Sequence, residues 1–232
     1  MPLAPIVLFV YNRPWHTQKT IEALKKNKLA EQSDLIIYSD APKNENALLQ
    51  VEAVRDYLET IVGFKSIKII ERSENWGLAK SIINGVTEVV NKSGKIIVLE
   101  DDLVTSPFFL RYMNDALLEY EYNEKVGCIH GYIYPVKGIK QDFFIKGADC
   151  WGWATWSRAW SVFEPDGGAL LDLIEGRDSI CFDPFNVKCG YVDMLRDQIA
   201  GRNNSWAVRW YFSALVNDLY CLYPAVSYIN NI

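Results

Sequence analysis

The sequence lacks any long apolar segment. No run in the 232 residues approaches the roughly eighteen that a membrane-spanning helix needs. The N-terminal apolar run, residues 6–10, is too short for the hydrophobic region of a secretory signal, and no basic segment precedes it. We therefore expect neither a span nor a signal peptide. A reducing cytoplasm is the expected setting, with peripheral attachment to a membrane left open.

Paired cysteines and excess basic charge are also missing. The five cysteines include no Cys-x-x-Cys pair, so neither a disulfide framework nor a zinc site is expected. The net charge of −5 argues against nucleic acid as a partner, because a nucleic-acid surface needs basic stripes. At 50% hydrophobic and 13% aromatic residues, the chain can build a large core, or flat surfaces that stack on sugars or bases.

Strand and helix patterns alternate through the first hundred residues. Strands are predicted at residues 5–10, 35–39, 66–71 and 95–99. Three helices are predicted between them. The first covers residues 15–27, the second has an apolar face formed by Val51, Val54, Leu58 and Ile61, and the third covers residues 78–93 and is ended by Gly94. This order predicts an α/β fold, a Rossmann-like, mainly parallel sheet with helices on both faces.

The second half of the sequence is less regular. A helix is expected over residues 107–122, and short strands near 126–129 and 143–146. Trp153, Trp156 and Trp160 recur at helical spacing, which is typical of a buried helix face. No linker or repeat is visible, so a single domain over residues 1–232 is expected. The chain stops after a strand-like segment at 226–229, which suggests a truncated C-terminus and a larger polypeptide.

Polar residues follow each of the four predicted strands. Ligands of open α/β sheets bind at the carboxyl ends of the strands. Each of these segments could be a solvated turn, but together they indicate a ligand site. They are Tyr11-Asn12-Arg13, Ser39-Asp40, Arg72-Ser73-Glu74-Asn75 and Glu100-Asp101-Asp102.

The acidic triplet Glu100-Asp101-Asp102 is the most informative of these segments. Three adjacent carboxylates at the end of a buried strand repel one another, and a bound cation would relieve the repulsion. With no His or Cys nearby, a hard divalent ion that carries phosphates is favoured over an acidic turn. Residues 11–16 contain no glycine, so a glycine-rich phosphate loop is not expected. The phosphates would be held by the metal and by side chains.

These segments resemble the motifs of GT-A glycosyltransferases, and the resemblance covers nearly the whole chain. It is strongest to the branch related to N-acetylglucosaminyltransferase I and to bacterial family-2-like enzymes of surface polysaccharide synthesis. It implies metal-dependent, inverting transfer of GlcNAc or a related hexose from a UDP-sugar to a glycan or lipid-linked glycan acceptor. It rests on Val7-Leu8-Phe9-Val10-Tyr11-Asn12-Arg13-Pro14, Tyr38-Ser39-Asp40, residues 75–85, Leu99-Glu100-Asp101-Asp102-Leu103 and residues 147–153.

The resemblance implies a role for each donor-side residue. Asp102 would ligate Mn²⁺ or Mg²⁺, and Asp101 and Glu100 would contact the ribose or donor sugar, or reach the metal through water. The nucleotide pocket would be lined by Asn12, Arg13 and Asp40, with Asp40 near the base, while uracil or phosphate would be held by Asn75 and Lys80. Residues 1–104 would form the nucleotide-sugar half and residues 105–232 the acceptor half.

The acceptor side departs from the family pattern. The catalytic carboxylate of an inverting member would fall in residues 205–210, which contain neither Asp nor Glu. Asp149 is the substitute candidate for the base, with Glu164 and Asp166 behind it. From the tryptophan-rich segment, Trp151 and Trp153 are expected to face the acceptor.

Two other functions compete with the transferase. A sugar-nucleotide nucleotidyltransferase shares the alternating order of elements, but it would require a glycine-rich loop after the first strand. A non-catalytic or degenerate carbohydrate-binding domain is suggested by the missing carboxylate near Ala207. A metal-dependent glycosyltransferase remains the leading hypothesis.

Overall fold

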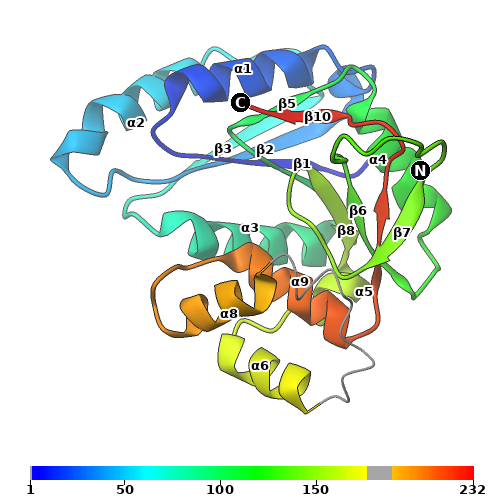
Figure 1. The fold of residues 1–232 in the computed structure, drawn as a ribbon. Helices are drawn as coiled ribbons and strands as arrows, with labels where there is room; N and C mark the ends of the chain where they lie inside the picture. Colours follow the sequence, from blue (N-terminus) through cyan, green and yellow to red (C-terminus); the bar gives the residue numbers. More distant parts are fainter. Residues whose placement is uncertain (1, 177–189) are drawn as a thin grey trace.

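The computed structural model describes residues 2–176 and 190–232, which form a mixed α/β fold around an eight-stranded sheet (Figure 1). The first four strands along one side of the sheet are mutually parallel, and β8 and β7 run antiparallel to their neighbours. The order across the sheet is β3 (Ser66–Glu71), β2 (Asp34–Ser39), β1 (Ile6–Val10), β4 (Lys95–Glu100), β8 (Trp153–Trp156), β6 (Val126–His130), β9 (Tyr220–Tyr223) and β7 (Phe143–Lys146). The predicted α/β sheet is confirmed.

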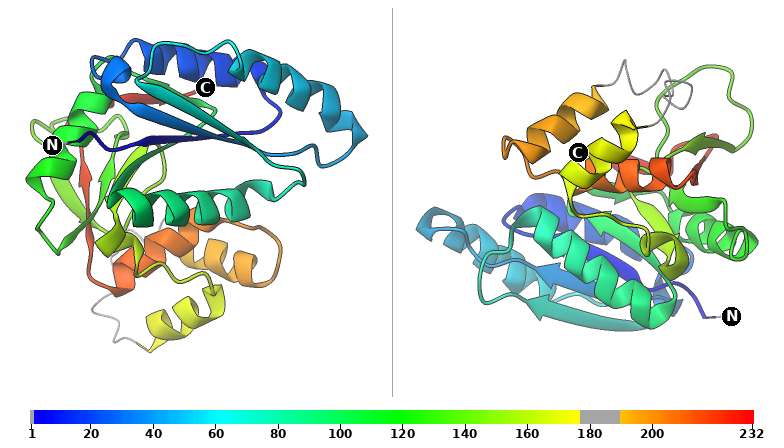
Figure 2. Two further views of the ribbon diagram at one scale, coloured as in Figure 1. Left: turned by 180° about the vertical axis from the view of Figure 1, so that it is seen from behind. Right: turned by 90° about the horizontal axis from the view of Figure 1, so that it is seen from below.

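Helices cover both faces of the sheet, as Figure 2 shows from behind. One face carries α1 (Pro14–Lys25) and α2 (Glu45–Leu58), and the helix α4 (Phe109–Glu119) packs into the same core. The opposite face carries α3 (Gly77–Ser93), α5 (Ser157–Trp160) and α9 (Trp206–Val216). The helices α6 (Gly167–Glu175) and α8 (Tyr191–Ile199) pack on α9. A short 3-10 helix, η1, covers Ala30–Gln32.

Alternation along the central strands creates the two cores. In β1, Ile6 and Leu8 face the core with α1, while Val7 and Phe9 face the core with α3. Successive side chains of a strand point to opposite faces, so this continuous apolar run serves both cores at once. The predicted end of α3 is confirmed, because Gly94 adopts φ 78°, a left-handed conformation that suits glycine.

The predicted helical arrangement of Trp153, Trp156 and Trp160 is wrong. Trp153 and Trp156 are the two ends of β8, and Trp160 is the last residue of α5. Pairing with β4 explains the difference, since residues 153–156 lie antiparallel to Lys95–Val98. All three side chains are nevertheless buried, as core residues should be.

The last residues of the chain lie beside the acidic triplet. Instead of a strand at 226–229, the structure has β10 (Ile229–Asn231), antiparallel to β5 (Leu103–Thr105). The Ile232 N–H donates to the carbonyl of Asp102 at 3.0 Å. The pairing fixes the segment that follows the triplet against the rest of the fold.

Two further features of the described residues bear on the sequence analysis. Cys128, Cys150 and Cys221 are free thiols, while Cys181 and Cys189 lie outside the described residues. In residues 2–176 and 190–232, none of the helices has the length and apolar character needed to cross a membrane.

Candidate functional site

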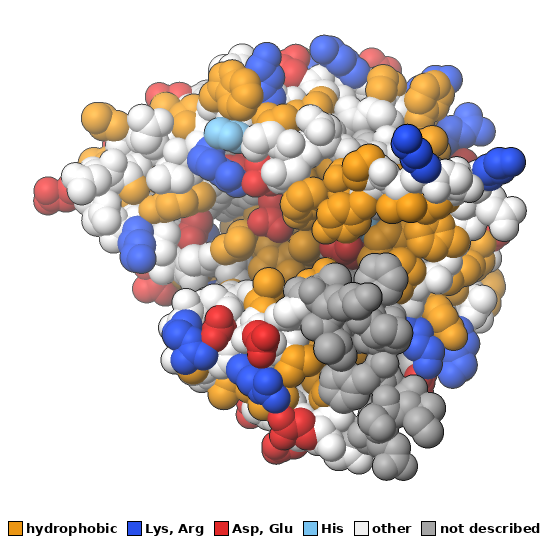
Figure 3. Space-filling view, viewed as in Figure 1, with side chains coloured by type: hydrophobic (Ala, Val, Ile, Leu, Met, Phe, Trp, Pro, Cys, Tyr) orange, Lys and Arg blue, Asp and Glu red, His pale blue; other side chains and the backbone are white. Residues whose placement is uncertain are grey.

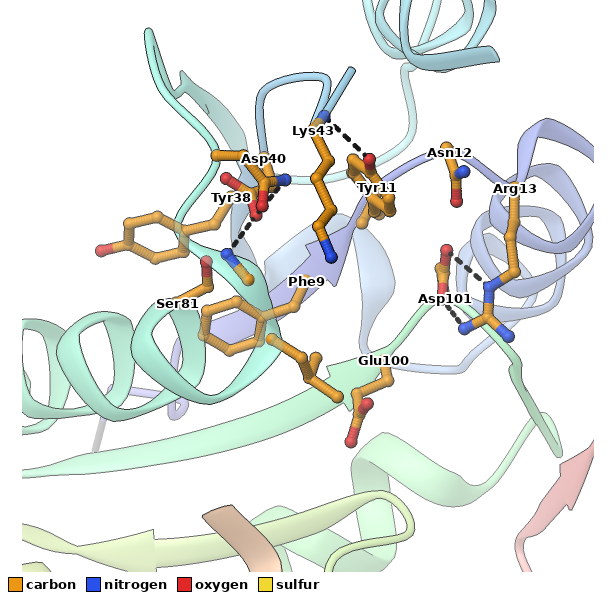
Figure 4. A pocket seen from close by; sticks show the side chains of 14 residues that line it. Phe9, Tyr11, Asn12, Arg13, Tyr38, Asp40, Lys43, Ser81, Glu100 and Asp101 are labelled. Atoms are coloured by element: carbon orange, nitrogen blue, oxygen red, sulfur yellow. Dashed lines mark hydrogen bonds and ion pairs between the residues drawn. The ribbon is translucent and has the colours of Figure 1, made fainter. Parts of the chain in front are cut away.

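A first cavity of about 350 Å³ opens at the carboxyl ends of β1, β2 and β4 (Figure 4). Asn12 and Arg13 reach it from β1, Asp40 from β2, and Glu100 and Asp101 from β4. Its remaining wall comes from the start of α3 and the segment before it: Asn75, Gly77, Leu78 and Ser81. The structure thus brings polar residues from all four predicted strand ends to one place.

Arg13 is shared between two carboxylates of the triplet. Its Nη2 and Nε contact the Asp101 carboxylate, and its Nη1 lies 3.1 Å from Asp102 Oδ2. Burial raises the pKa of Glu100 to about 8, the charges of Asp102 and Asp101 add to the rise, and Arg13 opposes it. Burial also raises the pKa of Asp101, against the opposing effect of Arg13. Arg13 thus offsets only part of the effect of burial and of the neighbouring carboxylates.

The triplet fits a divalent cation whose coordination a ligand helps to complete. Its donors are all carboxylate oxygens, which suit Mg²⁺ or Mn²⁺. Such an ion would offset the burial and the mutual repulsion that raise the pKa of Glu100 and Asp101. Among the residues that the structure describes, no group of three or more His, Cys, Asp or Glu is arranged to hold a metal ion. Further ligands would have to come from a phosphate-bearing substrate.

Asp40 and Asn75 are engaged by the protein itself. Asp40 Oδ1 accepts the N–H groups of Ala41 and Trp76, and its Oδ2 accepts that of Gly77 at 2.8 Å. Asn75 Nδ2 donates to Asp40 Oδ2 and to the carbonyl of Ala41. A carboxylate at a helix N-terminus is favourable, so this network fastens α3 to the end of β2. Both residues line the first cavity, and contact with a base stays a prediction.

Lys80 does not reach the first cavity. Its Nζ lies 4.2 Å from the centre of the Trp76 ring on the exposed side of α3. Each residue of a helix is turned by about 100° from the one before it, so Lys80 faces away when Leu78 and Ser81 face the cavity. The expected contact of Lys80 with uracil or phosphate is therefore not supported by its position.

Sequence reasoning missed two polar residues of the first cavity, Lys43 and Ser81. Lys43 follows β2 by four residues, and Ser81 lies one helical turn after the start of α3. Extending the strand-end rule into the following loop and the first helical turn would have included both.

A second cavity of about 270 Å³ lies between the ends of β6 and β8 and the helices α8 and α9. Asp149 lies in its wall, and its Oδ2 accepts the hydroxyl of Tyr223 at 3.0 Å. Asp149 Oδ1 accepts the Cys150 N–H at 2.7 Å and lies 3.5 Å from His130 Nε2. Most of the remaining lining is apolar or aromatic: Tyr132, Tyr134, Ala148, Trp151, Tyr191, Met194, Ala207, Val208 and Tyr211.

Cys150 lines the second cavity. Burial raises the pKa of its thiol well above the usual range, and the charges of Asp149 and Glu100 add to the rise. Asp149 belongs to the second cavity and Glu100 to the first, so carboxylates of both cavities influence this thiol. Figure 3 shows the corresponding hollow across this face, with acidic side chains inside it and apolar surface beside it.

Three other predicted residues do not line either cavity. The Glu164 carboxylate accepts the backbone N–H of Asp166 at 2.7 Å, and Asp166 caps the N-terminus of α6. Trp153 is 1% exposed and stacks within a buried cluster of tryptophans. Glu164 and Asp166 bind nearby backbone N–H groups, and Trp153 packs in the core. The catalytic contacts expected of Glu164 and Asp166, and the acceptor contact expected of Trp153, are therefore not supported. Trp151, in contrast, lines the second cavity.

Comparison with known families identifies the family of the chain. The family model "Glycosyl transferase family 2" matches residues 6–162, more than half of the chain. The chain belongs to glycosyl transferase family 2. Its mixed sheet with helices on both faces is the GT-A type of fold. A comparison with curated proteins gives no match.

Among the similar solved structures, one shares the fold over nearly the whole chain. A crystal structure of S. aureus TarS, residues 1–349, is 9% identical and has a TM-score of 0.51 over 97% of this chain and 59% of that chain. A second TarS structure is 12% identical, with a TM-score of 0.39 over 60% of this chain and 24% of that one. The mannosyltransferase PcManGT from Pyrobaculum calidifontis, in complex with GDP-Man and Mn²⁺, is 13% identical. Its TM-score is 0.39 over 57% of this chain and 36% of that chain. The chain thus spans less than two thirds of each of these structures.

Proposed function

We propose that this family 2 glycosyltransferase moves a hexosyl or N-acetylhexosaminyl group from a UDP-sugar to a glycan acceptor, with inversion. The observation that carries the proposal is the adjoining pair of cavities. One cavity is lined by carboxylates at the strand ends, and the other is aromatic and contains Asp149. A donor in the first cavity and an acceptor in the second would meet near Cys150, between Glu100 and Asp149.

The donor would lie in the first cavity. Asp102 and Asp101 would hold Mn²⁺ or Mg²⁺, which when bound stabilises negative charge on the departing diphosphate. Arg13 keeps both carboxylates in place and offers a further cation to the phosphates. Glu100 and Asn12 would contact the donor sugar or ribose from the ends of β4 and β1.

The acceptor would lie in the second cavity, with Asp149 as the base. Ala207 lines this cavity and belongs to the segment where the family's carboxylate is missing, so Asp149 faces the space that such a carboxylate would serve. The Tyr223 hydroxyl and the Cys150 N–H orient Asp149, which would accept the proton of the attacking hydroxyl. Trp151 and the neighbouring aromatic rings offer flat faces for an acceptor sugar.

The biological setting follows from the resemblance of the motifs. It favours surface polysaccharide synthesis, as in the branch related to N-acetylglucosaminyltransferase I, with a lipid-linked acceptor and peripheral attachment at the cytoplasmic side of a membrane. Residues 1–104 would bind the donor and residues 105–232 the acceptor.

Thermal melting with nucleotides and Mn²⁺ tests the donor side. We expect UDP with Mn²⁺ to raise the melting temperature, and Asp102→Asn to abolish the increase, because Asp102 is the more exposed of the two carboxylates that Arg13 contacts. Asp115→Asn, on the exposed side of α4, is the matched control. A UDP-release assay with UDP-GlcNAc then separates an enzyme from a non-catalytic binding domain. If millimolar nucleotide diphosphates with Mn²⁺ leave the melting temperature unchanged, the proposed donor is wrong.

A further inference from the structure

Ser81 departs from the hydrogen-bonding pattern of its own helix. Three other short polar side chains of α3 bond to the carbonyl four residues earlier: Asn84 at 2.8 Å, Thr87 at 2.6 Å and Ser93 at 2.7 Å. Ser81 is only 5% exposed, yet its Oγ has no partner among the described residues. A buried hydroxyl is usually satisfied, so this one calls for a partner that the protein does not supply.

Ser81 lies in the wall of the first cavity, at the end away from the acidic triplet. Figure 4 shows it near Tyr38 and Phe9, while Glu100 and Asp101 come from β4, on the other side of β1. The Phe9 and Tyr38 rings stack with centroids 5.3 Å apart. This end is flat and apolar, which suits a heteroaromatic base, while a metal-bound diphosphate belongs beside the carboxylates.

Lys43 reaches the same cavity from the loop after β2 (Figure 4). Its backbone N–H donates to the Tyr11 hydroxyl at 3.0 Å, which ties the loop to the segment after β1. Within residues 2–176 and 190–232, its ammonium group has no ion-pair partner. It is a cation available to a ligand.

We propose that Ser81 and Lys43 bind the nucleobase of the donor and favour a base with an oxo group on its hydrogen-bonding edge. A lysine ammonium only donates hydrogen bonds, whereas a serine hydroxyl donates or accepts. A carbonyl beside a ring N–H, as in uracil or guanine, satisfies both residues. Cytosine and adenine present an amino group where that carbonyl would be. This inference rests on the proposed function and adds the residues that select its donor.

Calorimetric titration of the full chain, with Mn²⁺ present, tests the proposal. We expect UDP or GDP to bind at least about tenfold more tightly than CDP and ADP, and Ser81→Ala to weaken the preferred ligand about tenfold. The difference between UDP and GDP identifies the base. Pyrophosphate with Mn²⁺ should bind Ser81→Ala as it binds the wild type, because it has no base. Ser93→Ala is the matched control, since it removes a hydroxyl of the same helix that bonds to a helix carbonyl.

The stability of the unliganded variant separates binding from folding. Ser81→Ala removes a hydroxyl without a partner, so its melting temperature should equal or exceed that of the wild type. Lys43→Met should keep the fold and reduce the preference for the oxo base. The inference would be overturned if Ser81→Ala bound the nucleotide as tightly as the wild type does. It would also be overturned if the variant lost as much affinity for pyrophosphate as for the nucleotide. If the folded wild type bound none of the four nucleotides, the proposed function itself would fail.

Discussion

At the residue scale, charge balance around single side chains organises both cavities. Arg13 offsets Asp101 and Asp102, while Glu100 keeps a raised pKa because burial and two neighbouring charges outweigh one guanidinium. In the second cavity, Asp149 gathers donors from Tyr223 and Cys150. The first arrangement leaves room for a cation, and the second holds one carboxylate in a fixed orientation.

His130 makes the stability depend on pH. Burial lowers the pKa of its imidazole, although the Asp149 charge opposes the change. The backbone N–H of Trp151 donates to its Nε2, and the Tyr223 ring packs against it. As pH falls below about 6.5, the unfolded chain binds a proton that the folded protein does not, so stability decreases. We expect His130→Gln to lose less free energy of unfolding between pH 7.5 and 5.5 than the wild type, as measured by urea titration. His16→Gln is the control. Equal losses in wild type and His130→Gln would contradict this account.

At the element scale, α3 carries the wall of the first cavity. Asp40 fastens its N-terminus, Gly94 ends it, and Gly85 brings it close to β1 and β2. A Cβ atom at Gly85 would lie 2.8 Å from two atoms of the Phe9 ring and 3.0 Å from the Tyr38 ring. The close approach places Ser81, one turn earlier, beside the same rings.

Replacing Gly85 by alanine should therefore displace the Phe9 and Tyr38 rings, which line the first cavity. We expect Gly85→Ala to cost about 1–3 kcal/mol of folding free energy, because overpacking against two buried rings outweighs the better helix propensity of alanine. It should also weaken nucleotide binding. Urea unfolding and nucleotide titration measure the two effects, with the exposed Asn91→Ala as control. A Gly85→Ala protein as stable as the wild type would show that Phe9 and Tyr38 can move aside.

At the scale of the whole molecule, the sheet places two chemically different cavities side by side. The parallel strands β1, β2 and β4 end at the carboxylates, while β8, antiparallel to β4 and β6, brings the segment of Asp149 back to the same region. The thiol of Cys150 lies within the electrostatic reach of both. A reaction between two substrates needs two binding sites that hold them next to each other.

Because donor and acceptor would occupy different cavities, a substitution in the second cavity should impair sugar transfer without impairing donor binding. Asp149→Asn should reduce sugar transfer by about 10²–10⁴-fold, because a general base is lost, with the affinity for donor nucleotide unchanged. Steady-state transfer assays together with nucleotide titration measure both quantities. Asp193→Asn, an exposed carboxylate of α8, is the control. Normal transfer in the Asp149→Asn variant would assign the base to another group.

Local sequence by itself determined the first four strands, the three helices between them and the carboxylates at the strand ends. These follow from short-range periodicity, capping by Gly94 and the rule for open sheets. Only the tertiary structure decided that Trp153 and Trp156 belong to a strand, since that depends on pairing with β4, more than fifty residues away. It also showed that Asp40 is held by α3, that Lys80 faces away, and that Lys43 and Ser81 enter the first cavity. Such outcomes depend on contacts between distant segments, which no local pattern encodes.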